Sequence, residues 1–226
     1  LKTVFGTLVE GNENAPAIVK SSVHHYAKEV SGKPLIRPAW FFDTTQQGEG
    51  LVDVSAHLVD LTFWECFPNQ PIEKEDLKLV SVQRWPTKLS PNDFKQVTGL
   101  SEYPDYLSPY IEEDTLRVYD NGAMNYTLKG HHAKVEVLWN FEAPTGTGDT
   151  HYSIMRGSKA NLEIVQGAFE NYVPTLYVNP TDSFDEYALS DAIEALSKTY
   201  DAITLEKLDS RWRIHIPESL REGHEA

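Results

Sequence analysis

The sequence predicts an α+β domain in which helices pack on one face of a largely antiparallel β-sheet. The prediction rests on about eight to ten strand-like segments that mostly follow one another, with only three or four helices among them. Residues 133–142 give the clearest strand, because apolar and polar side chains alternate along them. The side chains on the apolar face of this strand are Val135, Val137, Trp139 and Phe141.

Composition supports an ordinary globular domain and disfavours two classes of function. A chain of 226 residues with 40% hydrophobic residues is long enough to bury a sizeable core. The formal net charge of −14 disfavours binding to nucleic acid, because the chain repels phosphate groups. No apolar run approaches the roughly 18 residues that a membrane span needs. A single cysteine, Cys66, rules out an internal disulfide and is expected to be a small core residue.

Helix-capping residues and periodicity predict the elements of the first half. Residues 1–13 are expected to be a linker, and residues 14–226 the folded domain. A helix is predicted from Asn14 to Gly32, with a proline near its first turn. A strand over 35–43 should follow it. The remaining elements predicted here are a helix over 50–66, a strand over 77–85 and a short helix from Ser90 to Gly99.

The second half reads mainly as strands. A hairpin turn is predicted at Asp120-Asn121-Gly122, because this tripeptide favours tight turns. An amphipathic helix is predicted over 183–199, with Tyr187 among its inner residues. The strands predicted besides residues 133–142 are 115–120, 123–129, 150–156, 160–166, 202–207 and 211–216.

The helix over 50–66 carries the candidate site. Asp53, His57, Asp60 and Trp64 fall at i, i+4, i+7 and i+11, so they form one narrow stripe. Most other residues of this helix are apolar, which predicts a buried helix, and buried polar groups are costly unless they pair or face a cleft. A plainer interpretation makes His57 a core histidine bonded to a carbonyl, and Asp53 a helix N-terminal residue favoured by the dipole.

The same segment resembles a known family. The run Gly48-Glu49-Gly50, Asp53, His57 and Asp60-Leu61 resembles the Gly-Gly-Gly…Asp-x-x-x-His-x-x-Asp-Leu signature of the glucose-fructose oxidoreductase/inositol dehydrogenase (Gfo/Idh/MocA) family. The match lies in the C-terminal domain of that family, and residues 24–68 look closest to the branch called putative oxidoreductase C-terminal domain. Glu49 and Ala160 stand where the family often has glycine.

The resemblance implies the substrate-binding, catalytic domain of an NAD(P)-dependent oxidoreductase that acts on a CH–OH group of a sugar, cyclitol or related polyol. It implies that His57 is the general base, a task that suits histidine near neutral pH, and that Asp53 orients it or contacts the substrate. Asp60 is a weaker substrate-binding candidate and could instead be structural, paired with an arginine or the backbone. Residues 1–13 would be the linker remnant of an N-terminal Rossmann domain, which would supply a catalytic lysine and without which this chain is inactive.

Other motifs do not supply a cofactor or metal site. Gly146-Thr147-Gly148 lacks the third glycine and the following helix of a dinucleotide fingerprint, so NAD or NADP is expected in the full-length protein and not in this chain. Lys33 is not assigned as the catalytic lysine, because that motif belongs to the absent domain. The adjacent His131 and His132 do not favour a metal site.

Two alternatives stay open beside the enzyme. The chain could be a non-enzymatic carbohydrate- or partner-binding module that retains the fold, or a sheet that serves oligomerisation. The expected partners are a sugar-like small molecule, the chain's own Rossmann domain and a second copy bound through the open face of the sheet near Leu138. Localisation is open between the cytoplasm, as the default, and the periplasm.

Overall fold

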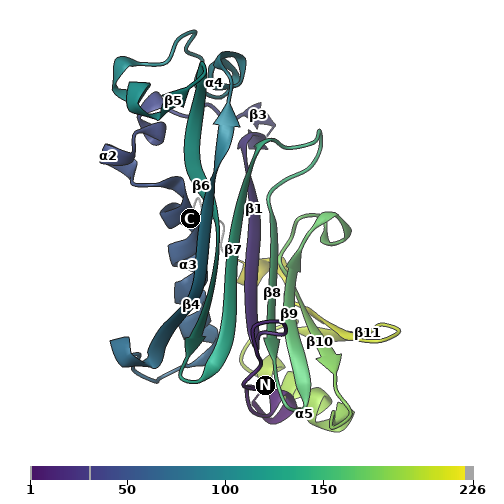
Figure 1. Ribbon diagram of the computed structural model, residues 1–226. Coiled ribbons are helices and arrows are strands. Elements are labelled where there is room, and N and C mark those ends of the chain that lie inside the picture. Colours follow the sequence, from purple (N-terminus) through teal and green to yellow (C-terminus); the bar gives the residue numbers. More distant parts are fainter. Residues whose placement is uncertain (1, 31, 222–226) are drawn as a thin grey trace.

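A single large sheet dominates the computed structural model, which describes residues 2–30 and 32–221 (Figure 1). Its strands have the order β11-β12-β10-β9-β8-β1-β7-β6-β4, and β5 pairs with β6. The neighbouring strands pair antiparallel, except β1 and β7, which run parallel. The predicted α+β class with a largely antiparallel sheet is therefore confirmed.

The elements have the following bounds. The strands of the sheet are β1 (Ile18–Ala27), β4 (Leu77–Leu89), β5 (Ile111–Glu112), β6 (Thr115–Leu128), β7 (His131–Glu142), β8 (Thr150–Arg156), β9 (Ala160–Gln166), β10 (Thr175–Pro180), β11 (Thr204–Lys207) and β12 (Trp212–His215). A separate ribbon pairs β2 (Glu29–Val30) with β3 (Lys33–Pro34). The α-helices are α1 (Lys2–Phe5), α2 (Thr44–Gln47), α3 (Gly50–Cys66), α4 (Pro91–Thr98) and α5 (Glu186–Ser197). The 3₁₀-helices are η1 (Ala39–Phe42), η2 (Lys74–Asp76), η3 (Asp105–Tyr110), η4 (Ala168–Glu170) and η5 (Glu218–Leu220).

Helix α3 lies along one face of the sheet, behind β4 and β6 in the view of Figure 1. The larger hydrophobic cluster fills the space between this helix and the sheet. Val135, Val137 and Trp139 of β7 are buried in it, as their alternation predicted. The strand register places these residues on the same face as the even-numbered residues of β1, so this face of β1 also looks toward α3.

A second hydrophobic cluster lies further along the same face. Val178 of β10, Ile214 of β12 and Leu189 of α5 are buried in it. Val4 of α1 joins them and is only 1% exposed, so the segment expected as a linker packs against the domain. Its expected connection to a preceding domain stays a prediction.

A row of polar side chains on β1 and β8 lies on this same face of the sheet, and we call it the polar strip. Its members on β1 are placed beside its members on β8 by the antiparallel register. The polar strip consists of Lys20, Ser22, His24, His151 and Ser153. Three of them, Lys20, Ser22 and Ser153, are almost fully buried.

The polar strip explains why the predicted helix over 14–32 was wrong. Residues 18–27 instead form β1, whose burial alternates over its first half. Lys20 and Ser22 occupy the inward positions between Ile18 and Tyr26. Polar residues at inward positions hide the two-residue period that identifies a strand.

The predicted hairpin at residues 120–122 was also wrong, because β6 continues through them. The side chains of Asp120 and Asn121 are buried and bonded, not turned to solvent. Asp120 Oδ1 accepts hydrogen bonds from the backbone N and Oγ1 of Thr87, at 3.2 and 2.9 Å. Asn121 Oδ1 accepts one from the backbone N of Trp139 at 2.7 Å. Asp and Asn usually favour a turn, but in this strand they form a buried hydrogen-bond network.

Three smaller differences separate the prediction from the structure. The predicted strand over 35–43 is absent, since η1 begins after Pro38, a residue without an N–H for a strand ladder. Strand β10 was not predicted. Tyr187 is 84% exposed, because Leu189 and Ile193 form the buried side of α5. The remaining predicted strands and the helix from Ser90 to Gly99 are present.

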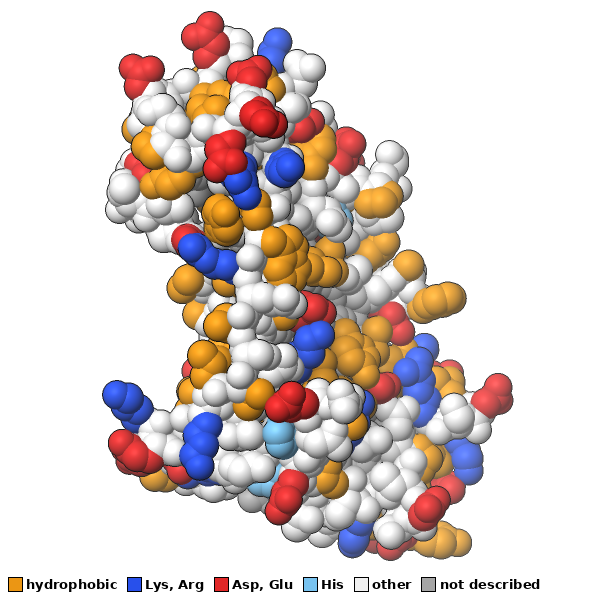
Figure 2. Space-filling view, viewed as in Figure 1, with side chains coloured by type: hydrophobic (Ala, Val, Ile, Leu, Met, Phe, Trp, Pro, Cys, Tyr) orange, Lys and Arg blue, Asp and Glu red, His pale blue; other side chains and the backbone are white. Residues whose placement is uncertain are grey.

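Among the residues that the structure describes, no helix is long and apolar enough to cross a bilayer. On the face seen in Figure 2, acidic side chains gather at the end of the molecule that carries α4 and β5.

Candidate functional site

The stripe predicted from the sequence lies on the solvent side of α3. Asp53, His57, Asp60 and Trp64 are all exposed, and Trp64 is 74% exposed. The opposite side of the helix, with Leu58 and Thr62, is buried. The prediction that this helix is buried was therefore wrong. The helix packs on the sheet with one side only, and its other side is exposed. The interpretation of His57 as a core histidine is wrong.

The stripe residues are free to meet a ligand. Within residues 2–30 and 32–221, no ion pair or side-chain hydrogen bond occupies Asp53, His57 or Asp60. The arginine or backbone pair considered for Asp60 is thus not formed among these residues. The side chains of Asp53 and His57 are one helical turn apart and point to the same side.

Two close contacts fix the N-terminal end of α3 on β6. A Cβ atom at Gly50 would lie 3.0 Å from Cβ of Asp120, and one at Gly122 would lie 2.8 Å from both terminal carbons of Leu51. Glu49, which departs from the family's glycine, forms an ion pair with Arg84 of β4. The first turn of the helix that carries Asp53 is therefore held against both strands.

A buried hydrogen bond between a tyrosine and an aspartate lies beneath this end of the helix. The hydroxyl of Tyr26 donates a hydrogen bond to Oδ2 of Asp120, and both side chains are fully buried. Burial, reinforced by the charge of Asp120 and by their hydrogen bond, raises the pKa of Tyr26 well above its usual value. Burial also raises the pKa of Asp120 to about 6.

Arg37 lies above the aromatic side chains of this region. Its guanidinium carbon is 4.6 Å from the ring centre of Phe41 and 5.3 Å from that of Trp139. Burial lowers the pKa of Arg37, whereas the charges of Tyr26, Asp149 and Asp53 raise it. Asp53 on α3 and Asp149, which precedes β8, therefore lie near one guanidinium, from two different parts of the fold.

Asp149 contacts three cationic or potentially cationic side chains. His24 and His25 place Nδ1 at 3.1 and 3.2 Å from its two carboxylate oxygens, and Lys28 forms an ion pair with it. Burial alone would raise the pKa of Asp149, but the hydrogen bonds from His24 and Lys28 hold it well below its usual range. Sequence reasoning missed this cluster, because Asp149 is more than a hundred residues away from both histidines in the chain.

The buried end of the polar strip is paired internally. Lys20 Nζ lies 2.6 Å from Glu65 Oε2 on α3 and donates a hydrogen bond to Ser153 Oγ at 2.9 Å. Burial, together with the nearby charges of Lys20 and His24, lowers the pKa of His151 to about 4, so its imidazole is neutral at physiological pH. No group of three or more His, Cys, Asp or Glu side chains suited to a metal ion occurs among the described residues.

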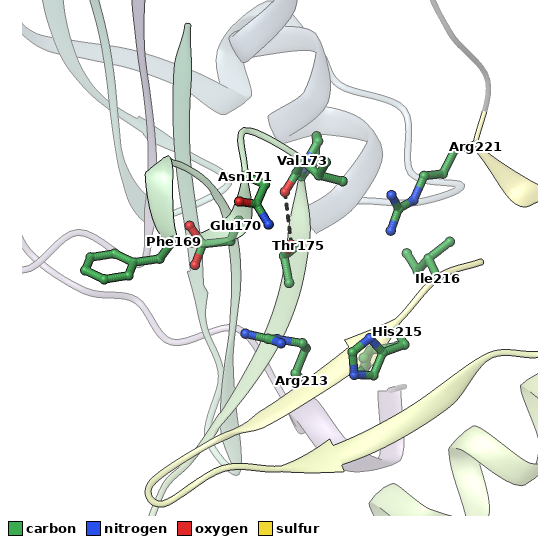
Figure 3. Close-up of a pocket in the computed structure, with 11 residues that line it drawn as sticks. Phe169, Glu170, Asn171, Val173, Thr175, Arg213, His215, Ile216 and Arg221 are labelled. Atoms are coloured by element: carbon green, nitrogen blue, oxygen red, sulfur yellow. Dashed lines mark hydrogen bonds between the residues drawn. The ribbon is translucent and has the colours of Figure 1, made fainter. Parts of the chain in front are cut away.

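A separate cavity of about 230 Å³ opens between β10, β12 and the loop that contains η4 (Figure 3). Arg213 and His215 on its wall both contact Glu206, at 3.2 and 2.9 Å. Glu170 accepts a hydrogen bond from the hydroxyl of Tyr177 at 2.9 Å. Arg213 and His215 thus already have a partner within the protein, and the lining of this cavity contains neither Asp53 nor His57.

Comparison with known proteins identifies the family. The family model described as "Putative oxidoreductase C terminal domain" matches residues 1–226. A putative oxidoreductase from Parabacteroides merdae is 48% identical, with a TM-score of 0.93 over 100% of this chain and 53% of that chain. The chain therefore spans about half the length of that protein.

More distant structures resemble the chain too weakly to carry an argument. A putative oxidoreductase from Erwinia carotovora atroseptica is 13% identical, with a TM-score of 0.46 over 89% of this chain and 51% of that chain. A 3-ketoreductase from Actinomadura kijaniata, in complex with NADP, is 13% identical, with a TM-score of 0.34 over 80% and 43%. None of the curated proteins compared with the chain matches it. The match of the family model to the whole chain and the 48% identity confirm the resemblance first noted around His57: the chain belongs to the putative oxidoreductase C-terminal domain family.

Proposed function

We propose that this chain is the substrate-binding and catalytic domain of an NAD(P)-dependent oxidoreductase acting on a CH–OH group of a sugar, cyclitol or related polyol. Membership of an oxidoreductase C-terminal domain family supports the reaction class. The observation that carries the proposal is the exposed pair Asp53 and His57 on α3, which no other side chain of the described residues occupies.

The two residues divide the work of the reaction. Bound nicotinamide supplies the hydride acceptor or donor. When the substrate hydroxyl is oxidised its proton must also leave, and His57 takes that proton as general base. Asp53, one turn earlier on the same face, hydrogen-bonds the substrate or orients the imidazole.

The cofactor is held by another part of the full-length protein. A helix N-terminus binds a pyrophosphate through free N–H groups and the positive end of the dipole. The N-terminus of α3 does not suit this task, since Glu49 precedes it and Asp120 lies against Gly50. These carboxyl groups disfavour phosphate there, in agreement with an N-terminal Rossmann domain as the cofactor-binding part.

Exposed apolar side chains in and beside the stripe support the docking of that domain. Val52, Leu61 and Trp64 of α3 are 59%, 41% and 74% exposed, and Leu79 and Val82 of β4 are also exposed. Large exposed apolar residues on one helix are typical of an interface. A domain that covers part of this surface would bring its nicotinamide to Asp53 and His57.

The charges near the site favour an uncharged substrate. Lys20 is paired with Glu65, and Lys28 with Asp149. His151 is neutral at physiological pH. The side chains left to contact a ligand include the exposed carboxylates of Asp53 and Asp60, which suit the hydroxyls of a polyol better than a phosphate.

Turnover by the full-length protein tests the proposal. His57→Ala should lower kcat by roughly 10²–10⁴-fold if His57 is the general base. The variant should remain folded, because His57 is exposed. His215→Ala is the matched control, since His215 is an exposed histidine on β12 outside the site. A folded His57→Ala protein that retains its turnover would refute the proposal.

A further inference from the structure

The polar strip is an unusual feature of this sheet face. Elsewhere the same face buries apolar side chains against α3 and α5. Burying polar groups destabilises a fold unless each finds a partner. Here Lys20, Ser153, Ser22 and His24 are all hydrogen-bonded within the protein. Four of the five residues of the polar strip therefore have hydrogen-bond partners, which hold their side chains in place next to the candidate site.

His24 is the member of the strip best held for contact with a ligand. Asp149 bonds its Nδ1 at 3.1 Å, and Ser22 Oγ lies 3.0 Å from its Nε2. Its ring stacks on Trp139, with the ring centres 5.0 Å apart. Its side chain is still 23% exposed, whereas Ser22 is only 3% exposed. The imidazole therefore has a fixed orientation and remains partly exposed.

The partners of His24 define which nitrogen carries the proton. Because Asp149 is held as a carboxylate, it accepts a hydrogen bond from Nδ1–H. In the tautomer that carries its proton on Nδ1, Nε2 is an acceptor, and the hydroxyl of Ser22 donates to it. An acceptor nitrogen in this position can equally receive a hydrogen bond from a hydroxyl of a ligand.

Arg37 connects His24 with the helical stripe. Its guanidinium carbon is 5.3 Å from the ring centre of Trp139, the ring on which His24 stacks. The charge of Asp53 acts on the same guanidinium. Asp53 and Asp149, the residue that bonds His24, both act on this guanidinium, which is the basis for placing one substrate near His24 and Asp53.

We propose that His24 binds a hydroxyl group of the substrate through Nε2, and that Asp149 is the positioning residue that holds its ring. The inference rests on the proposed function, because it places the substrate between β1 and the stripe of α3. His24 then determines which polyols are accepted, while His57 exchanges the proton with the reacting hydroxyl. The substrate hydroxyl takes the place of the Ser22 hydroxyl as the donor to Nε2.

The first test compares KM and kcat in the full-length protein with D-glucose, myo-inositol and the 2-, 3- and 6-deoxy analogues of glucose as probes. His24→Ala should raise KM about tenfold, as expected for one lost hydrogen bond of ordinary strength, and change kcat by less than about twofold. His24→Gln, whose amide oxygen can accept a hydrogen bond, should recover part of the loss. One deoxy analogue, the one that lacks the bound hydroxyl, should show no further loss in His24→Ala. His215→Ala should change neither constant.

A second measurement separates this inference from the proposed function. The ¹⁵N resonance of His24 Nε2 in the full-length protein, assigned by comparison with His24→Gln, should shift on addition of the same sugars. A shift without turnover would refute the proposed reaction and support binding at His24. Turnover that is unaffected by His24→Ala, with no shift of Nε2, would overturn the inference and leave the reaction standing. A fall in kcat at constant KM would also overturn it, because His24 would then act on the reacting group itself.

Discussion

Replacement of Gly122 by alanine tests how α3 is held on the sheet. Gly122 lies in the middle of β6, paired with Arg84 of β4 and Val137 of β7. An added Cβ would lie 2.8 Å from both terminal carbons of Leu51 and 3.0 Å from the backbone oxygen of Gln83. The distance to Leu51 is well below the roughly 3.5–4.0 Å at which carbon atoms pack without repulsion, and the distance to the oxygen of Gln83 is also too short for an ordinary contact.

The size of the effect follows from two opposing contributions. Forcing an extra carbon into a packed contact costs about 1–3 kcal/mol. Replacing glycine within a strand recovers about 0.5–1 kcal/mol, because alanine loses less backbone entropy on folding. The Leu51 side chain can rotate away, but the carbonyl of Gln83 belongs to the neighbouring strand and cannot. We therefore expect a net destabilisation of about 1–2 kcal/mol.

Urea unfolding followed by circular dichroism measures this difference. Gly122→Ala should lower the unfolding midpoint and leave the m-value unchanged. Gly148→Ala is the matched control, because an added Cβ there would meet only the ring of Tyr172 at an ordinary 3.6 Å, and it should change stability by less than about 0.5 kcal/mol. Equal midpoints for Gly122→Ala and the unaltered protein would refute the close packing of α3 on β6.

Three further predictions concern pH, cofactor and assembly. Because the folded-state pKa of Asp120 is raised to about 6 and that of His151 is lowered to about 4, folding holds an extra proton on the first and excludes one from the second between about pH 4 and 6. Acidification over this window should thus stabilise the protein through Asp120 and destabilise it through His151, each by up to about 3 kcal/mol. On acidification, the urea midpoint of Asp120→Asn should fall more steeply than that of the unaltered chain, and the midpoint of His151→Gln should rise. Parallel curves for all three proteins would contradict the argument. The isolated chain should bind neither NAD nor NADP in calorimetric titrations, since the glycine fingerprint is absent from it, and micromolar binding would refute this. The protein should form a symmetric oligomer through the open sheet face near Leu138, which light scattering tests, and a monomer at high concentration would count against it.

Local patterns in the sequence predicted the helix and its stripe correctly. The spacing of Asp53, His57, Asp60 and Trp64 depends only on the geometry of one helix, so their common face could be predicted without knowing the fold. Which face is exposed could not, because that depends on how the helix lies on β6 and β7. The capping residues of α4 were equally informative, since Ser90, Asp93 and Gly99 act within a single helix.

Features that depend on contacts between distant residues were missed. Lys20 finds Glu65 on another element, and Asp149 meets His24 across more than a hundred residues. Without these partners, the polar residues of β1 appeared incompatible with a buried strand. The turn predicted at Asp120 and Asn121 failed for the same reason. Their side chains form a buried hydrogen-bond network with Thr87 of another strand, and β6 continues through them.

The most direct test of the central claim is a crystal structure of the full-length protein with nicotinamide cofactor and a substrate identified by turnover. The quantity to measure is the distance from the imidazole of His57 to the reacting oxygen of the substrate. We expect a hydrogen bond of about 2.6–3.2 Å, with Asp53 contacting the substrate or the imidazole from the same helix face. A substrate bound away from α3, for example in the cavity of Figure 3, with His57 still facing solvent, would contradict the account.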